Sequence, residues 1–284
     1  MGPRAQQPRI AVMASPGGGY LSGVFAAWLV GGIAVPLCPS HPDKDIGYLL
    51  NNCRASVVLS DKAHLERMHQ LGKELRIPTK QIPACPLYEE IEALSVGELV
   101  DLSIDGLQNI QGELGALLIY TSGTTGRPKG VLHTHNSLGA QVHSLSVAWN
   151  MSSRDRVLHS LPLHHIHGVV NALFCPLFNG GIVEMLPKFS VHSVWGALTR
   201  KTDSLSVYMG VPTMYSFLAN LYDSESDEFQ SQARKGLRSL RLSICGSAAC
   251  PLPLMEKWRS ISGEYPLERY GMSETGMILG NPLD

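Results

Sequence analysis

The sequence predicts an α/β protein in which mainly parallel sheets are covered by helices on both faces. Short apolar or β-branched segments alternate along the chain with segments of helical spacing. This order is typical of parallel strands joined by helical crossovers. Hydrophobic residues make up 44% of the 284 residues and charged residues 17%. Such a composition indicates a globular chain with a large core and excludes a disordered one.

The first hundred residues contain several of these units. Residues 10–40 carry no charge, but glycines and a proline interrupt this stretch well short of the roughly 20 apolar residues that a membrane span needs. We therefore expect soluble core rather than a span. The expected elements are helices at 22–30, 43–52 and 64–74 and strands at 33–37 and 56–60.

Residues 78–102 are rich in turn formers and mark the best internal boundary. We divide the chain into a partial first α/β subdomain at 1–110 and a second at 111–284. In the second we expect strands at 115–120, 157–161, 182–186 and 241–245, helices at 136–149, 194–200 and 212–223, and an exposed polar loop at 224–236.

Net charge and cysteine use narrow the functional classes. The formal net charge of −1 gives no general attraction to nucleic acid or to anionic membranes, so we expect neither as a partner. No cysteines form a CxxC pair, and the N-terminus lacks the apolar stretch of a signal peptide. We expect a soluble intracellular protein, in the cytosol or a mitochondrion, with reduced thiols at Cys38, Cys53, Cys85, Cys175, Cys245 and Cys250.

The strongest motif is a glycine- and hydroxyl-rich loop, YTSGTTGRPKG, that follows an apolar strand and ends at Gly130. Glycines allow the backbone to approach a ligand closely, and free N–H groups and hydroxyls can surround phosphate oxygens. The spacing differs from the P-loop of nucleoside triphosphatases, which needs four residues between its glycines and a hydroxyl residue after its lysine. The residues predicted to bind phosphate are Thr121, Ser122, Gly123, Thr124, Thr125, Gly126 and Lys129.

This loop resembles the signature loop of the adenylate-forming superfamily, which includes acyl- and aryl-CoA synthetases, luciferases and the adenylation domains of peptide synthetases. The resemblance implies that the loop handles the β- and γ-phosphates of ATP, with Thr125 and Lys129 in catalytic roles. It also implies the fold of the large N-terminal domain of such an enzyme.

A second motif, RYGMSETG, begins at Arg269 and is similar to another superfamily segment. The resemblance implies that Tyr270 packs on adenine, Ser273 contacts the α-phosphate and Glu274 holds Mg²⁺. The superfamily more often has threonine at the position of Ser273, but the hydroxyl is retained. Arg269, Gly271 and Met272 complete the expected nucleotide-binding segment.

A third motif follows the strand at 241–245, where Gly246, Ser247 and Ala248 resemble the superfamily segment that lies along the adenine. Its position at the carboxyl end of a strand suits close backbone approach to a ligand. Taken alone, this motif is equally consistent with a simple strand-to-helix turn.

Three histidines lie close together at 164, 165 and 167. Adjacent residues of a strand point to opposite faces, so His164 and His165 would not share one metal ion, whereas His165 and His167 could. No cysteine or carboxylate is near them in sequence, which disfavours metal. In the superfamily, a histidine at the position of His165 lies beside the reacting carboxylate, and we expect it to orient that group by a neutral N–H.

Within the superfamily the chain is most similar to malonate–CoA ligases, notably at 162–168, 210–215, 241–251 and 268–272. Malonate brings a second carboxylate that needs a buried cation, and a planar guanidinium is the natural partner. We expect His165, His167, Arg241 and Arg269 to bind the acid; a surface salt bridge is the alternative for each arginine.

The resemblance implies an ATP-dependent acid–CoA ligase whose partners are a small-molecule acid, ATP with Mg²⁺, and CoA. Alternatives are a ligase for another short-chain or aromatic acid, and an inactive nucleotide-binding fragment. The superfamily's opening strands have no counterpart at the start. Its later ribose-binding aspartate, hinge and mobile C-terminal domain with a catalytic lysine have none at the end. We therefore expect a chain truncated at both ends.

Overall fold

A computed structural model describes residues 7–84, 110–121, 126–200 and 202–283. The chain forms two compact units, Met1–Gly139 and Ala140–Asp284, and the division falls within helix α6 (His135–Ala148). The sequence placed the subdomain boundary at 110, whereas the strands at 115–121 and 129–134 belong to the sheet of the first unit.

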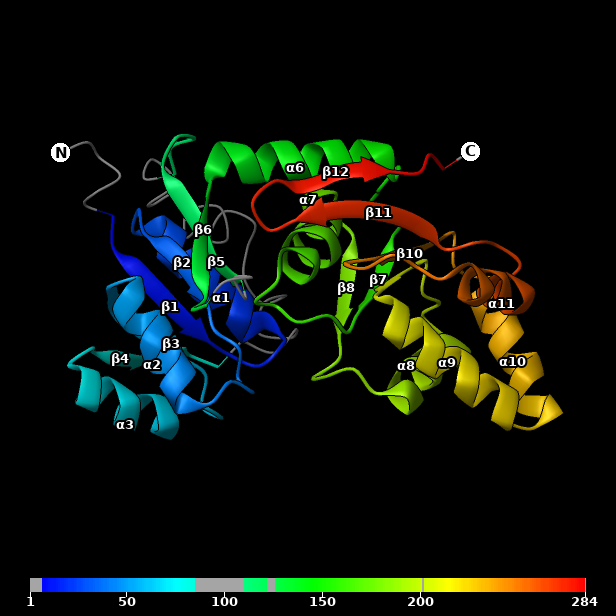
Figure 1. Ribbon diagram of the computed structural model, residues 1–284, viewed down its shortest axis with the longest axis horizontal. Helices are drawn as coiled ribbons and strands as arrows, with labels where there is room; N and C mark the ends of the chain where they lie inside the picture. Colours follow the sequence, from blue (N-terminus) through cyan, green and yellow to red (C-terminus); the bar gives the residue numbers. More distant parts are fainter. Residues whose placement is uncertain (1–6, 85–109, 122–125, 201, 284) are drawn as a thin grey trace, which may run out of the picture. The chain divides into compact units, whose positions relative to one another are not determined.

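The first unit contains a mainly parallel sheet with strand order β4-β3-β1-β2-β5-β6 (Figure 1). Only the β5–β6 pair is antiparallel among the strands that the structure describes here. The strands are β1 (Arg9–Met13), β2 (Ile33–Pro36), β3 (Ala55–Ser60), β4 (Thr79–Gln81), β5 (Gly115–Thr121) and β6 (Lys129–Thr134); the helices are α1 (Gly18–Leu29), α2 (Asp43–Asn52) and α3 (Leu65–Leu75).

Helices cover both faces of this sheet. Ile46 and Leu50 of α2 and Met68 of α3 pack in one core with alternate residues of β1, β2 and β3. On the opposite face α1 lies so close to β1 that a Cβ at Gly23 would be 2.8 Å from Val12. The expected layered architecture is thus confirmed for this unit. The sequence missed β1, β4 and β6; β4 lies in the turn-rich stretch at 78–102, and β6 begins within the glycine-rich loop.

The second unit contains a sheet with strand order β12-β11-β10-β9-β7-β8, parallel except for the β11–β12 pair. The strands are β7 (Arg156–His159), β8 (Ile182–Met185), β9 (Val207–Gly210), β10 (Leu242–Gly246), β11 (Leu267–Met272) and β12 (Gly276–Gly280). The helices are η3 (His167–Phe174), α7 (Cys175–Phe178), α8 (Val191–Thr199), α9 (Pro212–Ser224), α10 (Asp227–Leu237) and α11 (Leu252–Ser262).

Helices α8 to α11 share one core with the sheet of the second unit. Trp195, Tyr215 and Trp258 are fully buried there, and Tyr208 and Cys245 point into it from β9 and β10. The hydroxyl of Tyr215 donates a hydrogen bond of 2.8 Å to the Ile244 carbonyl, which fixes α9 to β10. This packing holds the carboxyl end of β10, where the glycine–serine–alanine motif begins.

The expectation of an exposed loop at 224–236 is wrong, because most of this stretch forms helix α10. The Ser226 hydroxyl accepts a hydrogen bond from the Phe229 N–H and caps the helix. Acidic residues lie in its first turn and basic residues in its last, which complements the helix dipole. Only Ala233 and Leu237 are buried, so the sequence shows little of the apolar stripe that predicts a helix.

The histidine segment is not a strand. Residues 161–165 form a turn, Ile166 caps the helix that follows, and His167 begins the π-helix η3, all of whose residues are buried. The rings of His164 and His165 lie with their centroids 4.2 Å apart, so the alternation expected of a strand does not apply. Short π-helical segments are frequent at functional sites.

Two further properties concern thiols and membranes. The described cysteines are buried free thiols, while Cys85 lies outside the described residues. Within the part of the chain that the structure describes, no helix is long and apolar enough to cross a membrane.

Candidate active site

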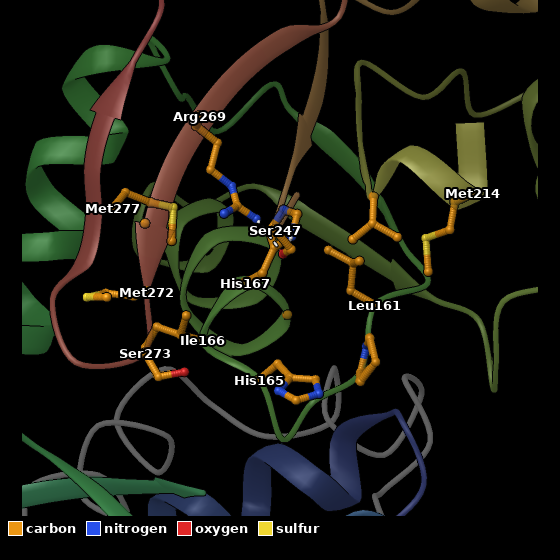
Figure 2. A pocket seen from close by; sticks show the side chains of 14 residues that line it. Leu161, His165, Ile166, His167, Met214, Ser247, Arg269, Met272, Ser273 and Met277 are labelled. Carbon is orange, nitrogen blue, oxygen red and sulfur yellow. Dashed lines mark hydrogen bonds between the residues drawn. The ribbon is translucent and has the colours of Figure 1, made fainter. Parts of the chain in front are cut away.

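A cavity of about 420 Å³ opens in the second unit between the histidine turn, η3 and the hairpin of β11 and β12. Figure 2 shows Arg269 above this space and His165 at its lower edge. Its lining is mostly apolar, with a few polar side chains among apolar ones, as is usual for small-molecule sites. The lining residues are Leu161, Pro162, His165, Ile166, His167, Gly168, Val211, Met214, Ser247, Arg269, Gly271, Met272, Ser273 and Met277.

Arg269 carries a buried positive charge into the lining of this cavity. Its side chain projects from β11, the residue is only 7% exposed, and burial lowers the pKa of its guanidinium to about 10. Nη2 donates a 3.3 Å hydrogen bond to the Ser247 hydroxyl, while Nε has no partner among the described residues. No carboxylate of the described chain pairs with it. A buried cation without a counter-ion is costly, so this position favours an anionic ligand.

His167 lies beside Arg269 as a neutral imidazole. Burial, followed by the charges of Arg269 and nearby histidines, holds its pKa well below the usual range. Its Nδ1 is 3.3 Å from the hydroxyl of Ser247, which also accepts a hydrogen bond from Nη2 of Arg269. Its Nε2 is buried without a partner in the described chain. The cluster offers hydrogen-bond donors and positive charge, as an anion requires.

The glycine that ends β10 sets the position of the Arg269 side chain. A Cβ at Gly246 would lie 2.6 Å from both Cζ and Nε of Arg269, so the guanidinium rests directly on this glycine. Ser247 follows with a left-handed φ of 69°, a conformation that is uncommon outside glycine. The turn thereby brings the Ser247 hydroxyl between Arg269 and His167 (Figure 2).

Arg241, also expected to bind the acid, is not placed with this cluster. Its guanidinium forms a two-pronged ion pair with Asp155, at 2.7 and 2.6 Å, and also donates to the carbonyls of Trp149 and Asn150. Asp155 is 2% exposed. Burial would raise the pKa of this carboxyl, but hydrogen bonds from Arg241, Ser206 and the Ser152 N–H outweigh burial and lower it. Arg241 therefore serves the fold, and Arg269 is the arginine at the cavity.

Ser273 and Glu274 lie in the turn that joins β11 to β12. Ser273 is half-buried and lines the cavity, whereas Glu274 is exposed and has no ion-pair partner among the described residues. Magnesium in nucleotide sites is usually held by one or two carboxylates together with phosphate oxygens and waters. A single free carboxylate on a fixed turn fits such an ion.

A second cavity, of about 670 Å³, adjoins the first at Ser247 and Arg269. It is lined by Ser247, Ala248, Ala249, Glu268, Arg269, Tyr270, Gly271, Leu279, Gly280 and Asn281. Tyr270 is 57% exposed, so an aromatic face is accessible for stacking. The segments that the sequence assigned to adenine are thus brought together at one cavity, although Gly246 itself stays behind Arg269.

The phosphate loop belongs to the first unit, at the end of the β5–β6 hairpin. Thr121 pairs with Lys129 across the hairpin, and Gly126 has a φ of 148°. The Arg127 guanidinium lies over the Tyr48 ring, whose hydroxyl donates a 3.1 Å bond to the Pro128 carbonyl. The predicted phosphate-binding residues at 122–125 lie outside the described residues.

Sequence reasoning missed the apolar part of the site. Val211, Met214 and Met277 line the first cavity, but their side chains carry no chemical signature that separates them from core residues. Two signals existed for Val211 and Met214: they lie in the 210–215 segment that resembles malonate–CoA ligases, and they follow a buried strand, where α/β sheets bind ligands.

The chain belongs to the AMP-binding enzyme family, whose profile it matches over residues 4–284. It is 40% identical over 283 residues to a malonate–CoA ligase of Arabidopsis thaliana, and 41% identical over 286 residues to the mitochondrial malonate–CoA ligase ACSF3 of Homo sapiens. These matches cover 97% and 98% of this chain but 46% and 48% of the relatives. The chain therefore spans about half the length of the curated relatives it matches.

Solved structures agree with this family. ATP-bound MatB from Rhodopseudomonas palustris matches with a TM-score of 0.79 at 26% identity, over 98% of this chain and 52% of that one. A malonyl-CoA ligase in a ternary product complex with methylmalonyl-CoA and AMP matches with a TM-score of 0.76 at 30% identity, over 97% and 54%. The expected large α/β domain of an adenylate-forming enzyme is thus confirmed.

Proposed function

We propose that the protein activates malonate with ATP as an acyl-adenylate and transfers the acyl group to CoA. The family and the relatives named malonate–CoA ligases support acid–CoA ligation as the reaction. The observation that carries the choice of acid is Arg269, a buried cation at the cavity with no counter-ion among the described residues. A monocarboxylic acid has no group for this charge once its single carboxylate is at the reacting end.

The residues of the cavity have distinct roles in this proposal. Arg269 and His167 bind the distal carboxylate of malonate, with Ser247 holding both in place by hydrogen bonds. His165, on the opposite edge of the cavity, orients the reacting carboxylate (Figure 2). The apolar wall at Leu161, Ile166 and Met214 encloses the carbon chain and excludes water.

The nucleotide is assigned to the second cavity and to the motif residues that the resemblance marks. Tyr270 stacks on adenine, with Ser247 and Ala248 along the base, and Ser273 contacts the α-phosphate. Thr125 and Lys129 of the phosphate loop act on the β- and γ-phosphates. Glu274 would hold Mg²⁺, which neutralises phosphate charge.

The reaction consists of two successive displacement steps. A carboxylate oxygen of malonate attacks the α-phosphorus, the bond from that phosphorus to the bridging oxygen breaks, and pyrophosphate leaves with the electron pair. The CoA thiolate then attacks the acyl carbon and AMP leaves. Positioning by His165 and charge compensation by Lys129 are the contributions of this chain's own residues to the first step.

Calorimetric titration of the chain with malonate, acetate, butyrate and coumarate tests the acid. Malonate is expected to bind most tightly, and Arg269→Ala to weaken it by roughly two to four orders of magnitude, since breaking a buried charge-assisted pair typically costs about 3–5 kcal/mol. Acetate binding should persist. Arg238→Ala removes an exposed arginine of the same unit as the matched control.

Tighter binding of an apolar acid than of malonate would contradict malonate as the substrate and favour a ligase for another short-chain or aromatic acid. A malonate affinity of Arg269→Ala within a few fold of the parent's would do the same. Acid-dependent release of pyrophosphate from ATP tests the reaction separately. The animal relatives named mitochondrial support the mitochondrion as the compartment, which localisation of a tagged protein checks.

A further inference from the structure

The side chain of Gln141 pairs with the backbone of β12 as a neighbouring strand would. Gln141 lies on α6, which runs alongside β12 in the second unit (Figure 1). The Met277 N–H donates to Oε1 at 2.7 Å, and Nε2 donates to the Met277 carbonyl at 3.2 Å. One amide therefore satisfies both backbone groups of an edge strand, which would otherwise have no partner on that side.

Gly276 allows this close approach. An added Cβ at this residue would overlap the amide of Gln141, and its φ of 68° is in the left-handed region. No other residue type fits both conditions without displacing the glutamine. The contact is thus a built feature of the turn rather than a chance surface hydrogen bond.

The pairing fixes the far end of the turn that carries Ser273 and Glu274. On the near side, β11 pairs with β10 within the sheet. On the far side, β12 pairs with β11 alone among the described strands. The Thr275 N–H closes the turn to the Met272 carbonyl at 3.2 Å. Among the described residues, the hydrogen bonds with Gln141 are the ones that hold the backbone of β12 from outside the β11–β12 hairpin.

We propose that Gln141 is a positioning residue that sets the Glu274 turn for the ATP-bound magnesium ion, an inference that rests on the function proposed above. Gln141 is not itself a lining residue of either cavity; it acts through Gly276 and through Met277, which lines the first cavity. The exposed carboxylate of Glu274 has no partner of its own among the described residues, so its direction depends on the backbone of this turn.

Two variants perturb the contact from opposite sides. Gln141→Met keeps the length of the side chain but removes both hydrogen-bonding atoms, and Gly276→Ala pushes the amide away. Ser144→Ala on the exposed face of the same helix is the control. The readouts are hydrogen exchange of the Met277 amide, thermal unfolding, and the affinity for ATP measured with and without Mg²⁺.

In both variants the Met277 amide hydrogen should exchange at least about tenfold faster than in the parent. The increase in ATP affinity that Mg²⁺ confers should be about tenfold smaller. The affinity for ATP without Mg²⁺ should change little. Faster exchange with the full magnesium gain would show a merely structural contact and overturn the inference. Unchanged exchange would overturn the contact itself. A parent chain without measurable ATP affinity would instead overturn the proposed function, which the parent titration reports separately.

Discussion

Replacement of Gly246 by alanine tests whether the position of Arg269, and not only its charge, determines binding of the acid. The new Cβ would lie 2.6 Å from Cζ and Nε of Arg269, whereas ordinary contacts begin at 3.4 Å. The guanidinium must therefore move by about 0.8 Å. Gly246 does not have a positive φ, so the backbone accepts alanine, and a long side chain moves more easily than the strand.

The displacement sets the expected magnitude. A charge-assisted bond of about 2.8 Å lengthened by this amount exceeds 3.5 Å and is largely lost. Such bonds contribute about 1.5–3 kcal/mol, so malonate should bind roughly 10- to 150-fold more weakly. The free energy of unfolding should change by less than about 1 kcal/mol, because alanine also restricts the unfolded chain.

The assay is calorimetric titration with malonate and acetate, together with chemical denaturation. Gly196→Ala is the matched control, since a Cβ there meets nothing within 4 Å; it should leave malonate affinity unchanged and stabilise α8 by up to about 1 kcal/mol. If Gly246→Ala binds malonate as tightly as the parent, the guanidinium on this glycine does not hold the acid, and the reasoning fails.

Three further outcomes are expected. Arg241→Ala leaves the buried Asp155 carboxylate unpaired, so chemical denaturation should show a free energy of unfolding lower by about 3–5 kcal/mol. The affinity of the folded protein for malonate should equal that of the parent. Weaker malonate binding with unchanged stability would show that Arg241 binds the acid. The pKa of His167 is lower in the folded than in the unfolded state, so below about pH 6.5 the unfolded chain takes up the proton first and the free energy of unfolding falls. Between about pH 7.5 and 5, the unfolding temperature of His167→Gln should therefore fall less than that of the parent. An equal fall in the two proteins would show that another group causes the acid sensitivity. Lys129→Ala should weaken ATP binding about 10- to 150-fold and leave malonate binding unchanged, and equal ATP affinities would remove the phosphate-loop assignment.

The sequence by itself determined the class of the fold and the chemistry of the motifs. The helix expected at 43–52 is α2 residue for residue, and the strand expected at 115–120 is β5 within one residue. Both predictions succeed because local apolar periodicity and flanking turn residues act over a few neighbouring positions. The loop ending at Lys129 and the segment at 269–276 carry hydroxyls, glycines and charges in a fixed order, so their chemistry is readable without coordinates.

Only the tertiary structure separated the two arginines proposed for the acid. Arg241 and Arg269 are chemically identical in the sequence, but Asp155, which lies 86 positions before Arg241, pairs with one of them. The hydrogen bonds between Gln141 and Met277 join residues 136 positions apart in the sequence. No sequence pattern around either residue predicts this contact. Helix α10 likewise depends on a cap and on two buried side chains. Pairings of this kind are decided by which segments the fold brings together, because a charge or an amide takes its role from the partner it meets.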